Sequence, residues 1–155
     1  MAKQSEGGIK IITTNRKAYH DYNVEDTIEA GMVLQGSEVK SVAAGKVNLT
    51  DAYCRVDKGE MWVHNLHIAP YENAGYAQHE PRRKRKLLLH KAEIERLRAK
   101  SEQKGYTLIP LKLYFRNGKA KLEIGLVRGK RQYDKRETIK RKDIEREMQR
   151  EMGRR

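Results

Sequence analysis

The 155-residue sequence has little of what several protein classes require. Its single cysteine, Cys54, excludes an internal disulfide framework and a cysteine-built zinc site, and it favours a reducing, cytosolic setting. No segment approaches the roughly 18 consecutive apolar residues of a membrane-spanning helix, and residues 1–10 hold no apolar run typical of a secretory signal. Hydrophobic residues make up only 37% of the chain. We therefore expect a cytoplasmic protein with a modest core and no membrane partner.

The short motifs of common enzymes are also missing. The sequence has no G-x-x-x-x-G-K-[ST], G-x-G-x-x-G, H-E-x-x-H or G-x-S-x-G pattern, so phosphate-cradling loops, zinc proteases and α/β-hydrolases have no local signature. His64 and His67 are spaced three apart, and on a strand such residues point to opposite faces, which disfavours a shared metal ion. We expect no catalytic residues, no metal and no cofactor.

Positive charge is what the sequence has in excess. Lysine and arginine number 34 against 21 aspartates and glutamates, which gives a net charge of +13. Residues 1–81 carry a net charge of −3, residues 82–127 carry +10, and residues 128–155 carry +6. Cations added only for solubility would not need to be segregated in this way. The pattern indicates a positive face that meets a polyanion, usually nucleic acid.

Hydrophobic patterning predicts a mainly β fold. Six candidate strands, a mid-chain helix over 90–104 and a short helix over 37–44 with Ser37 as N-cap favour an OB-like antiparallel β-barrel. Residues 19–24 read as one strand, and Gly31 in the next strand marks a bulge or a close backbone approach. We expect a flexible N-terminus over 1–8, the barrel over 9–128, and a basic tail over 129–155 that is disordered alone and folds on a partner.

A hairpin over 107–128 is the best-defined element, because Asn117-Gly118 lies between two alternating runs. A two-residue turn pairs Arg116 with Lys119, and the predicted register continues through Lys112 opposite Glu123 to Leu111 opposite Ile124. The predicted core face holds Ile109, Leu111, Leu113, Phe115, Leu122, Ile124 and Leu126, and the predicted outer face holds Lys112, Tyr114, Lys121 and Glu123.

A run of five cations lies in the middle of the chain and leads directly into Leu87-Leu88-Leu89. Only Glu80 is close in sequence as a counter-charge, so phosphate contact is favoured over a merely solvated loop. If the leucines are extended, Leu88 points away from its neighbours and reaches the surface. The five candidate phosphate contacts are Arg82, Arg83, Lys84, Arg85 and Lys86.

Several segments along almost the whole chain form a recognisable series. They are Asn15-Arg16-Lys17-Ala18-Tyr19-His20-Asp21-Tyr22, Glu29-Ala30-Gly31, Leu34-Gln35-Gly36-Ser37-Glu38-Val39-Lys40-Ser41, Gly45-Lys46-Val47-Asn48-Leu49 with Asp51 and Tyr53, Arg85-Lys86-Leu87-Leu88-Leu89-His90 and Gly129-Lys130-Arg131-Gln132-Tyr133-Asp134-Lys135-Arg136. In this order they resemble the bacterial SsrA-binding protein family, also called small protein B. The chain departs from the family pattern at Ala43, where the family usually carries arginine.

The resemblance implies an OB-like barrel with a long tail and a role as RNA-binding adaptor in trans-translation. Its partners would be the tRNA-like domain of transfer-messenger RNA and the stalled 70S ribosome, where the tail enters the decoding centre and the empty mRNA channel. We expect a monomer in the free form. The residues that the resemblance implies as RNA-facing are Asn15, Glu29, Leu88 and Lys121, and those of the tail are Tyr133, Asp134, Lys135 and Arg136.

Two other hypotheses stay open on the sequence. One is a general ribosomal or single-strand RNA-binding protein of the same barrel class, which the function of the tail would distinguish from the adaptor. The other is an RNA-acting enzyme with an unrecognised site, which turnover of purified RNA would reveal.

Overall fold

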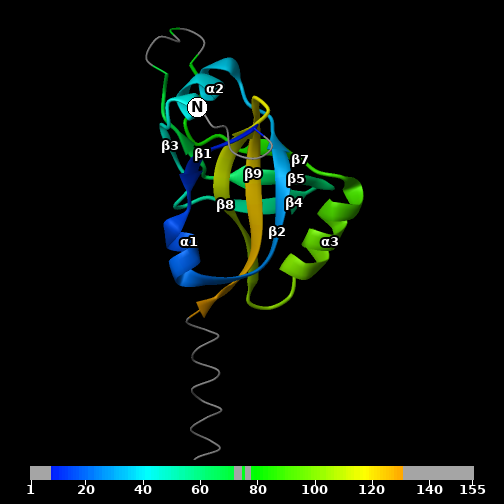
Figure 1. The fold of residues 1–155 in the computed structure, drawn as a ribbon. Coiled ribbons are helices and arrows are strands. Elements are labelled where there is room, and N and C mark those ends of the chain that lie inside the picture. The colour runs from blue at the N-terminus through cyan, green and yellow to red at the C-terminus, as the bar shows by residue number, and fades with distance from the viewer. Residues whose placement is uncertain (1–7, 72–74, 76–77, 131–155) are drawn as a thin grey trace, which may run out of the picture.

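The computed structural model of the chain describes residues 8–71, 75 and 78–130 (Figure 1). Strands dominate this part of the chain, and three helices accompany them. The strands are β1 (Ile9–Thr14), β2 (Tyr22–Met32), β3 (Val47–Asn48), β4 (Tyr53–Asp57), β5 (Glu60–His64), β6 (His67–Ile68), β7 (Arg85–Leu88), β8 (Tyr106–Arg116) and β9 (Lys119–Gly129). The helices are α1 (Arg16–Asp21), α2 (Gly36–Ala43) and α3 (Lys91–Ser101).

The longer strands form an antiparallel sheet that closes on itself. Neighbouring strands are hydrogen-bonded in the order β1-β8-β4-β5-β7-β2-β9, and β8 also pairs with β9. This additional pairing joins the two sides of the sheet into a ring, while β3 and β6 pair separately. In Figure 1, α1 and α3 flank the lower part of the ring and α2 lies at its upper end. The predicted mainly β, OB-like class is confirmed in this form.

The β8–β9 hairpin has the predicted register over its outer half. Arg116 pairs with Lys119, and the pairs follow as expected to Lys112 opposite Glu123. Beyond that point the prediction is wrong, because the register shifts between Pro110 and Lys112 and Pro110, not Leu111, pairs with Ile124. Proline has no N–H to donate to a strand ladder, which makes it typical of such irregularities.

The shift at Pro110 divides the apolar residues of the hairpin between two clusters. Leu111 leaves the main core and packs with Ala18, Ile109 and Val127. Gly125 makes room for it, since a Cβ at that glycine would lie 2.5 Å from Cδ1 of Leu111. The hairpin therefore packs Leu113, Leu122 and Ile124 into the interior of the ring. Its other apolar side chains, Ile109, Leu111 and Val127, pack against Ala18 of α1.

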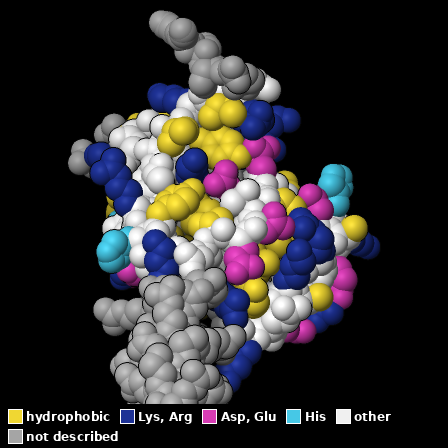
Figure 2. All heavy atoms as spheres, turned by 60° about the horizontal axis from the view of Figure 1, so that its bottom comes forward, with side chains coloured by type: hydrophobic (Ala, Val, Ile, Leu, Met, Phe, Trp, Pro, Cys, Tyr) yellow, Lys and Arg dark blue, Asp and Glu magenta, His cyan; other side chains and the backbone are white. Residues whose placement is uncertain are grey.

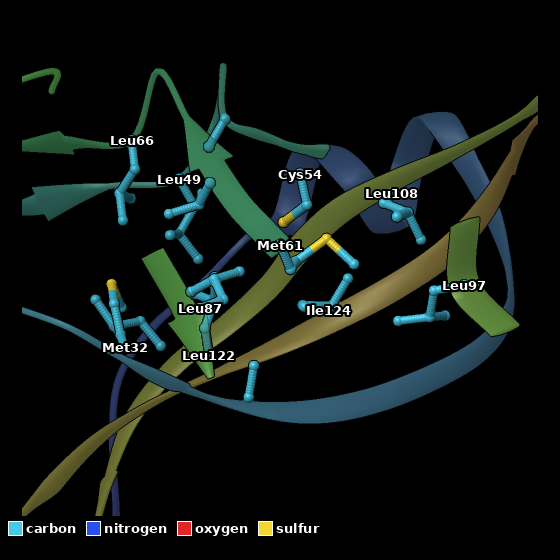
Figure 3. Packing of buried hydrophobic residues seen from close by; sticks show 14 of the residues in the cluster. Met32, Leu49, Cys54, Met61, Leu66, Leu87, Leu97, Leu108, Leu122 and Ile124 are labelled. Atoms are coloured by element: carbon cyan, nitrogen blue, oxygen red, sulfur yellow. The ribbon is translucent and has the colours of Figure 1, made fainter. Parts of the chain in front are cut away.

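The main core fills the inside of the ring with aliphatic and sulfur-containing side chains. Figure 3 shows them pointing toward one another from strands on opposite sides. Leu87, Leu122 and Ile124 are each at most 1% exposed, and Cys54 lies among them at 5%. Since each buried aliphatic side chain contributes roughly 1.5–3 kcal/mol, this small core is the main source of stability. The labelled members are Met32, Leu49, Cys54, Met61, Leu66, Leu87, Leu97, Leu108, Leu122 and Ile124.

The helices differ from the sequence-based expectation at their ends. Residues 19–21 belong to helix α1 rather than to a strand, because the Oδ1 atom of Asn15 accepts a hydrogen bond from the Ala18 N–H and starts a helical turn. Helix α2 begins one residue before Ser37, and its N-cap is Gln35, whose N–H donates to Glu38 at 2.8 Å. Helix α3 has the predicted N-cap, His90, but ends at Ser101 rather than at 104.

Candidate nucleic-acid interface

A row of outward-facing residues crosses the sheet from β7 to β1. Gly31 of β2 pairs with Leu88 of β7 on one side and with Lys121 of β9 on the other. Lys121 in turn pairs with Tyr114 of β8, and Tyr114 pairs with Ile11 of β1. Paired residues of an antiparallel sheet point to the same face. We call these five residues the outer row; its two ends, Leu88 and Ile11, are 54% and 57% exposed.

A hollow of about 390 Å³ opens in this face, beside Gly31. A Cβ atom at Gly31 would lie 3.4 Å from the Cβ of Leu88 and 3.8 Å from the Nζ of Lys121, so the glycine keeps a gap between an apolar and a cationic side chain. The hollow brings together three of the four residues that the resemblance implies as RNA-facing. Its lining consists of Glu29, Gly31, Leu88, Leu89, His90, Glu93 and Lys121.

Glu29 is held as a carboxylate by two neighbours on β8. The Tyr114 hydroxyl donates a hydrogen bond to it, and the Nε of Arg116 donates another at 3.0 Å. Burial opposes the charge on Glu29, but these two hydrogen bonds outweigh burial and hold the pKa of Glu29 below its ordinary value. Burial and the bond to Glu29 raise the pKa of Tyr114. Glu29 also offsets the like-charge pair of Arg116 and Lys119 at the hairpin tip.

Asn15, in contrast, has an interior role. Its side chain is 3% exposed, and its Nδ2 donates to the carbonyl oxygens of Leu49 at 3.2 Å and Pro110 at 3.0 Å. With its Oδ1 capping α1 at Ala18, every polar atom of the side chain is engaged within the protein. An RNA-facing side chain is therefore a wrong expectation for Asn15, which instead fixes α1 against β8.

The basic run over 82–86 divides between the interior and the surface. Arg85 is 0% exposed; its Nε donates to the carboxylate of Glu38 and its Nη1 to the carbonyl oxygen of Leu66 at 2.7 Å. Arg83 donates to the same carboxylate through Nε at 3.1 Å. Arg85 is fully buried and paired with Glu38, so the predicted phosphate contact by Arg85 is wrong. The sequence does not reveal this pair because Glu38 lies 47 positions away.

Arg83 and Arg85 form an ionic cluster with the buried carboxylate of Glu38. Glu38 is 0% exposed, and burial alone would raise its pKa, but hydrogen bonds from Arg83, from the Gln35 backbone and from Arg85 lower the pKa of Glu38 instead. The cluster ties α2 to the start of β7. It places Arg85 in the interior, whereas the side chain of Arg83 stays 28% exposed and remains at the surface.

The other three cations of the run face outward. Arg82 donates from Nη1 to the Oδ1 of Asn65 at 2.9 Å, and Lys86 forms an ion pair with Glu60. The Nζ of Lys84 lies 4.5 Å from the ring centroid of Trp62. These side chains remain candidates for phosphate contact. Figure 2 shows that lysines and arginines on the face it presents are interspersed with acidic and apolar side chains, so charge alone does not mark one site there.

Other expectations from the sequence have simpler outcomes. Among the described residues, no group of three or more His, Cys, Asp or Glu side chains is placed to hold a metal ion. In the same part of the chain no helix is long and apolar enough to cross a lipid bilayer. Ala43 is exposed at the end of α2. The tail candidates Tyr133, Asp134, Lys135 and Arg136 lie outside the described residues.

Two residues of the site had weaker signals in the sequence. Gly31 was expected to mark either a bulge or a close approach, and the structure supports the close approach, since the irregularity in β2 lies between Val24 and Asp26. Nothing in the sequence marks Ile11 as part of this face. A register shift between Ile11 and Thr13 sets its direction, and no local pattern announces that shift.

A closed ring of antiparallel strands with apolar, cationic and acidic side chains around one surface hollow is typical of nucleic-acid-binding proteins of the OB-like class. The chain matches the SmpB protein family over residues 12–154 and belongs to that family. The SsrA-binding proteins of Bacillus cytotoxicus and Bacillus cereus are each 54% identical to it over 145 residues, covering 94% of this chain and 94% of each relative. A solved structure, described as "tmRNA-SmpB: a journey to the center of the bacterial ribosome", is 56% identical with a TM-score of 0.66, over 76% of this chain and 83% of that one.

Proposed function

We propose that this protein is an RNA-binding adaptor of trans-translation, which binds the tRNA-like domain of transfer-messenger RNA and delivers it to stalled ribosomes. Residues 9–128 serve as the RNA-binding domain, and the tail over 129–155 engages the decoding centre and the empty mRNA channel. The protein acts in the cytoplasm, without catalysis of its own and as a monomer when free. Membership of the SmpB family and the names of the SsrA-binding relatives support this assignment.

The hollow beside Gly31 carries the proposal for the folded domain. Leu88 offers an apolar surface of the kind on which a base packs, and Lys121 stands across the hollow to neutralise a phosphate. The absence of a side chain at Gly31 lets a nucleotide approach the sheet closely. The site thus combines a contact for a base with a contact for the backbone, which a purely electrostatic binder does not need.

Glu29 has a distinct role in this arrangement. A carboxylate near phosphate is unfavourable by charge, so its value to RNA binding lies in accepting a hydrogen bond from a base and in orienting Arg116. Arg116 compensates the charge of Glu29 within the protein itself. Glu29→Gln keeps an acceptor oxygen and removes the charge, so it separates the two roles.

The test for the folded domain is the affinity of the full chain for a transcript of the tRNA-like domain. Glu29→Gln should retain most of the affinity if Glu29 accepts a base hydrogen bond, and should lose affinity together with Glu29→Ala if it acts by holding Arg116. An absence of affinity for this RNA in the unaltered protein would overturn the proposal, and so would equal affinity for any RNA of the same length.

The test for the tail is the deletion of residues 129–155. Binding to the tRNA-like RNA should remain, whereas tagging of stalled products in a reconstituted translation reaction should be lost. Tyr133→Ala and Lys135→Ala–Arg136→Ala in the full chain should reproduce part of that loss, since an aromatic ring stacks on a ribosomal base and the cations meet phosphate. Loss of RNA binding on deletion would favour a general basic-tail binder instead.

A further inference from the structure

A second group of aromatic and cationic side chains lies on the outer face of the ring, beside the hollow. It is built on β4, β5 and the segment that enters β7. Successive side chains of a strand alternate between its faces, so every second residue of these strands shares the outer surface. We call this group the platform; it consists of Tyr53, Arg55, Trp62, His64, Lys84 and Lys86.

Three rings form the floor of the platform. Tyr53 of β4 pairs with His64 of β5, and their rings stack with centroids 5.2 Å apart and planes inclined by 10°. In the next outward row, Trp62 lies between Arg55 of β4 and Lys86 of β7. Tyr53 is 42% exposed and Trp62 is half-buried, so the surface is neither a closed core nor a set of isolated side chains.

Cations surround these rings. The Nζ of Lys84 lies 4.5 Å from the Trp62 ring centroid, Arg55 is exposed on the opposite side, and Lys86 is paired with Glu60. Burial, together with the nearby charges of Lys84 and Arg55, lowers the pKa of His64, so its ring is neutral near pH 7. The next outward row, Asp57 opposite Glu60, is acidic, so the positive charge beside the rings comes from Lys84 and Arg55. Lys84 lies over the Trp62 ring, so a base that stacks there takes the place of this cation.

The platform is continuous with the hollow through β7. Along that strand Arg85 and Leu87 point inward, whereas Lys86 and Leu88 point outward, two positions apart. Strand residues two apart are separated by about 6.6 Å, close to the span of one nucleotide. A chain of nucleotides that followed β7 away from Leu88 would meet Lys86, which pairs with Trp62 of β5.

We propose that the platform binds unpaired nucleotides of the RNA whose structured part occupies the hollow, with a base on Trp62 and phosphates at Lys84 and Arg55. Aromatic faces with interleaved cations are the chemistry that recognises single-stranded RNA, because every base has a face that stacks and every linkage carries a charge. This inference rests on the proposed RNA-binding function and extends it to a further set of contacts. In this arrangement Lys84 and Lys86 face the RNA beside Trp62. Arg83 and Arg85 of the same run bind Glu38 instead.

The chain itself supplies the probe for this proposal, since Trp62 is its only tryptophan. Titration of the full-length protein with tRNA-like RNA that carries an unpaired extension should quench the fluorescence of Trp62 and reduce its quenching by acrylamide. The same RNA without the unpaired extension should bind at the hollow but leave the Trp62 signal nearly unchanged. Unchanged fluorescence at saturation by the extended RNA overturns the platform.

Substitutions give an independent measure. Trp62→Leu should weaken binding of the extended RNA about tenfold, as loss of one base–aromatic stack does, while Trp62→Phe should retain most of it. Lys84→Gln should weaken binding about threefold and lower the salt dependence by roughly 0.7 of a counterion per lost phosphate contact. Lys104→Gln, an exposed lysine after α3, is the matched control. Thermal unfolding checks that each variant folds. If Trp62→Leu does not fold, the affinity and salt dependence of Lys84→Gln test the platform.

The outcomes separate the platform from the function on which it rests. If the unextended RNA binds and responds to Leu88→Ala but Trp62 and Lys84 have no effect on the extended RNA, the proposed function stands and the platform fails. If neither RNA binds the unaltered protein, the proposed function fails as well. If Lys104→Gln weakens binding as much as Lys84→Gln, only the net charge matters and the platform is overturned.

Discussion

Two glutamates of this protein hold arginines in different environments, and the contrast shows how the same chemistry serves two purposes. Glu38 is 0% exposed and binds Arg83 and Arg85 in the interior, whereas the Glu29 side chain is 34% exposed and binds Arg116 and Tyr114 at the surface. Both have a lowered pKa in spite of burial. In the interior, Glu38 fixes α2 against the start of β7. At the surface, Glu29 leaves its carboxylate within reach of a ligand.

Removal of the charge at Glu38 should have the largest effect on the free energy of unfolding. Glu38→Gln leaves Arg85 buried without its counter-charge, and we expect a loss of about 3 kcal/mol or more in denaturant unfolding. Glu29→Gln, the matched control at the surface, should cost less than about 1 kcal/mol. Equal losses at the two positions would contradict the distinction between them.

The lowered pKa of Glu38 predicts how the free energy of unfolding responds to acid. The pKa of Glu38 in the folded chain lies below its ordinary value of 4.5, so its contribution is complete above that pH and is lost as the pH falls through the folded pKa. The free energy of unfolding of the unaltered protein should therefore fall below pH 4.5 more steeply than that of Glu38→Gln. Parallel curves in the acidic range would show that the cluster does not contribute in this way.

Leu88→Ala should separate binding from stability. Because the side chain is 54% exposed, we expect stability to change by no more than about 0.5 kcal/mol, while affinity for tRNA-like RNA falls by about 1–2 kcal/mol. Val39→Ala, an apolar residue of α2 that is 40% exposed, should change neither quantity. A large loss of stability for Leu88→Ala would place this residue with the interior set.

Lys121→Ala tests the cation of the hollow. Its affinity for RNA should fall by about 1 kcal/mol, and the slope of affinity against salt concentration should decrease by about one counterion. Lys46→Ala, in the exposed loop after α2, serves as the control of equal charge. An unchanged salt slope would exclude a phosphate contact at Lys121.

Gly31→Ala should have the smallest effect of the series. The added methyl group meets Leu88 at an ordinary contact distance of 3.4 Å, so the fold should tolerate it. Because the methyl group narrows the gap, RNA affinity should fall measurably, but by less than in Lys121→Ala. Gly36→Ala, where a Cβ has nothing within 4 Å, is the control. Full affinity in Gly31→Ala would show that no ligand enters the gap between Leu88 and Lys121.

The parts of the structure that followed from the sequence depend on short-range geometry. The Asn117-Gly118 turn determines which residues of β8 and β9 face each other, and the prediction holds until Pro110 shifts the register. The exposure of Leu88 follows from the alternation of an extended chain beside a buried Leu87. In both cases a few adjacent residues contain the whole cause.

The parts that failed depend on partners far apart in the sequence. Nothing near Arg85 announces Glu38, and nothing near Asn15 announces the carbonyl oxygen of Pro110, 95 positions away. Asn15 did carry a local signal as an N-cap before Arg16, but the aromatic run that follows it was interpreted as a strand. Only the structure shows which of the residues implied by resemblance lie at the surface, as Leu88 does, and which lie in the interior, as Asn15 does.

Cys54 has a practical consequence for the study of these surfaces. It lies in the main core, and burial raises the pKa of its thiol, so the nucleophilic thiolate is scarce and inaccessible at neutral pH. Since the chain has no other cysteine, a single cysteine introduced at an exposed position, as in Lys104→Cys, becomes the only group that maleimide reagents modify. Fluorophores or spin labels can thus be attached at chosen points without replacing any native residue of the core.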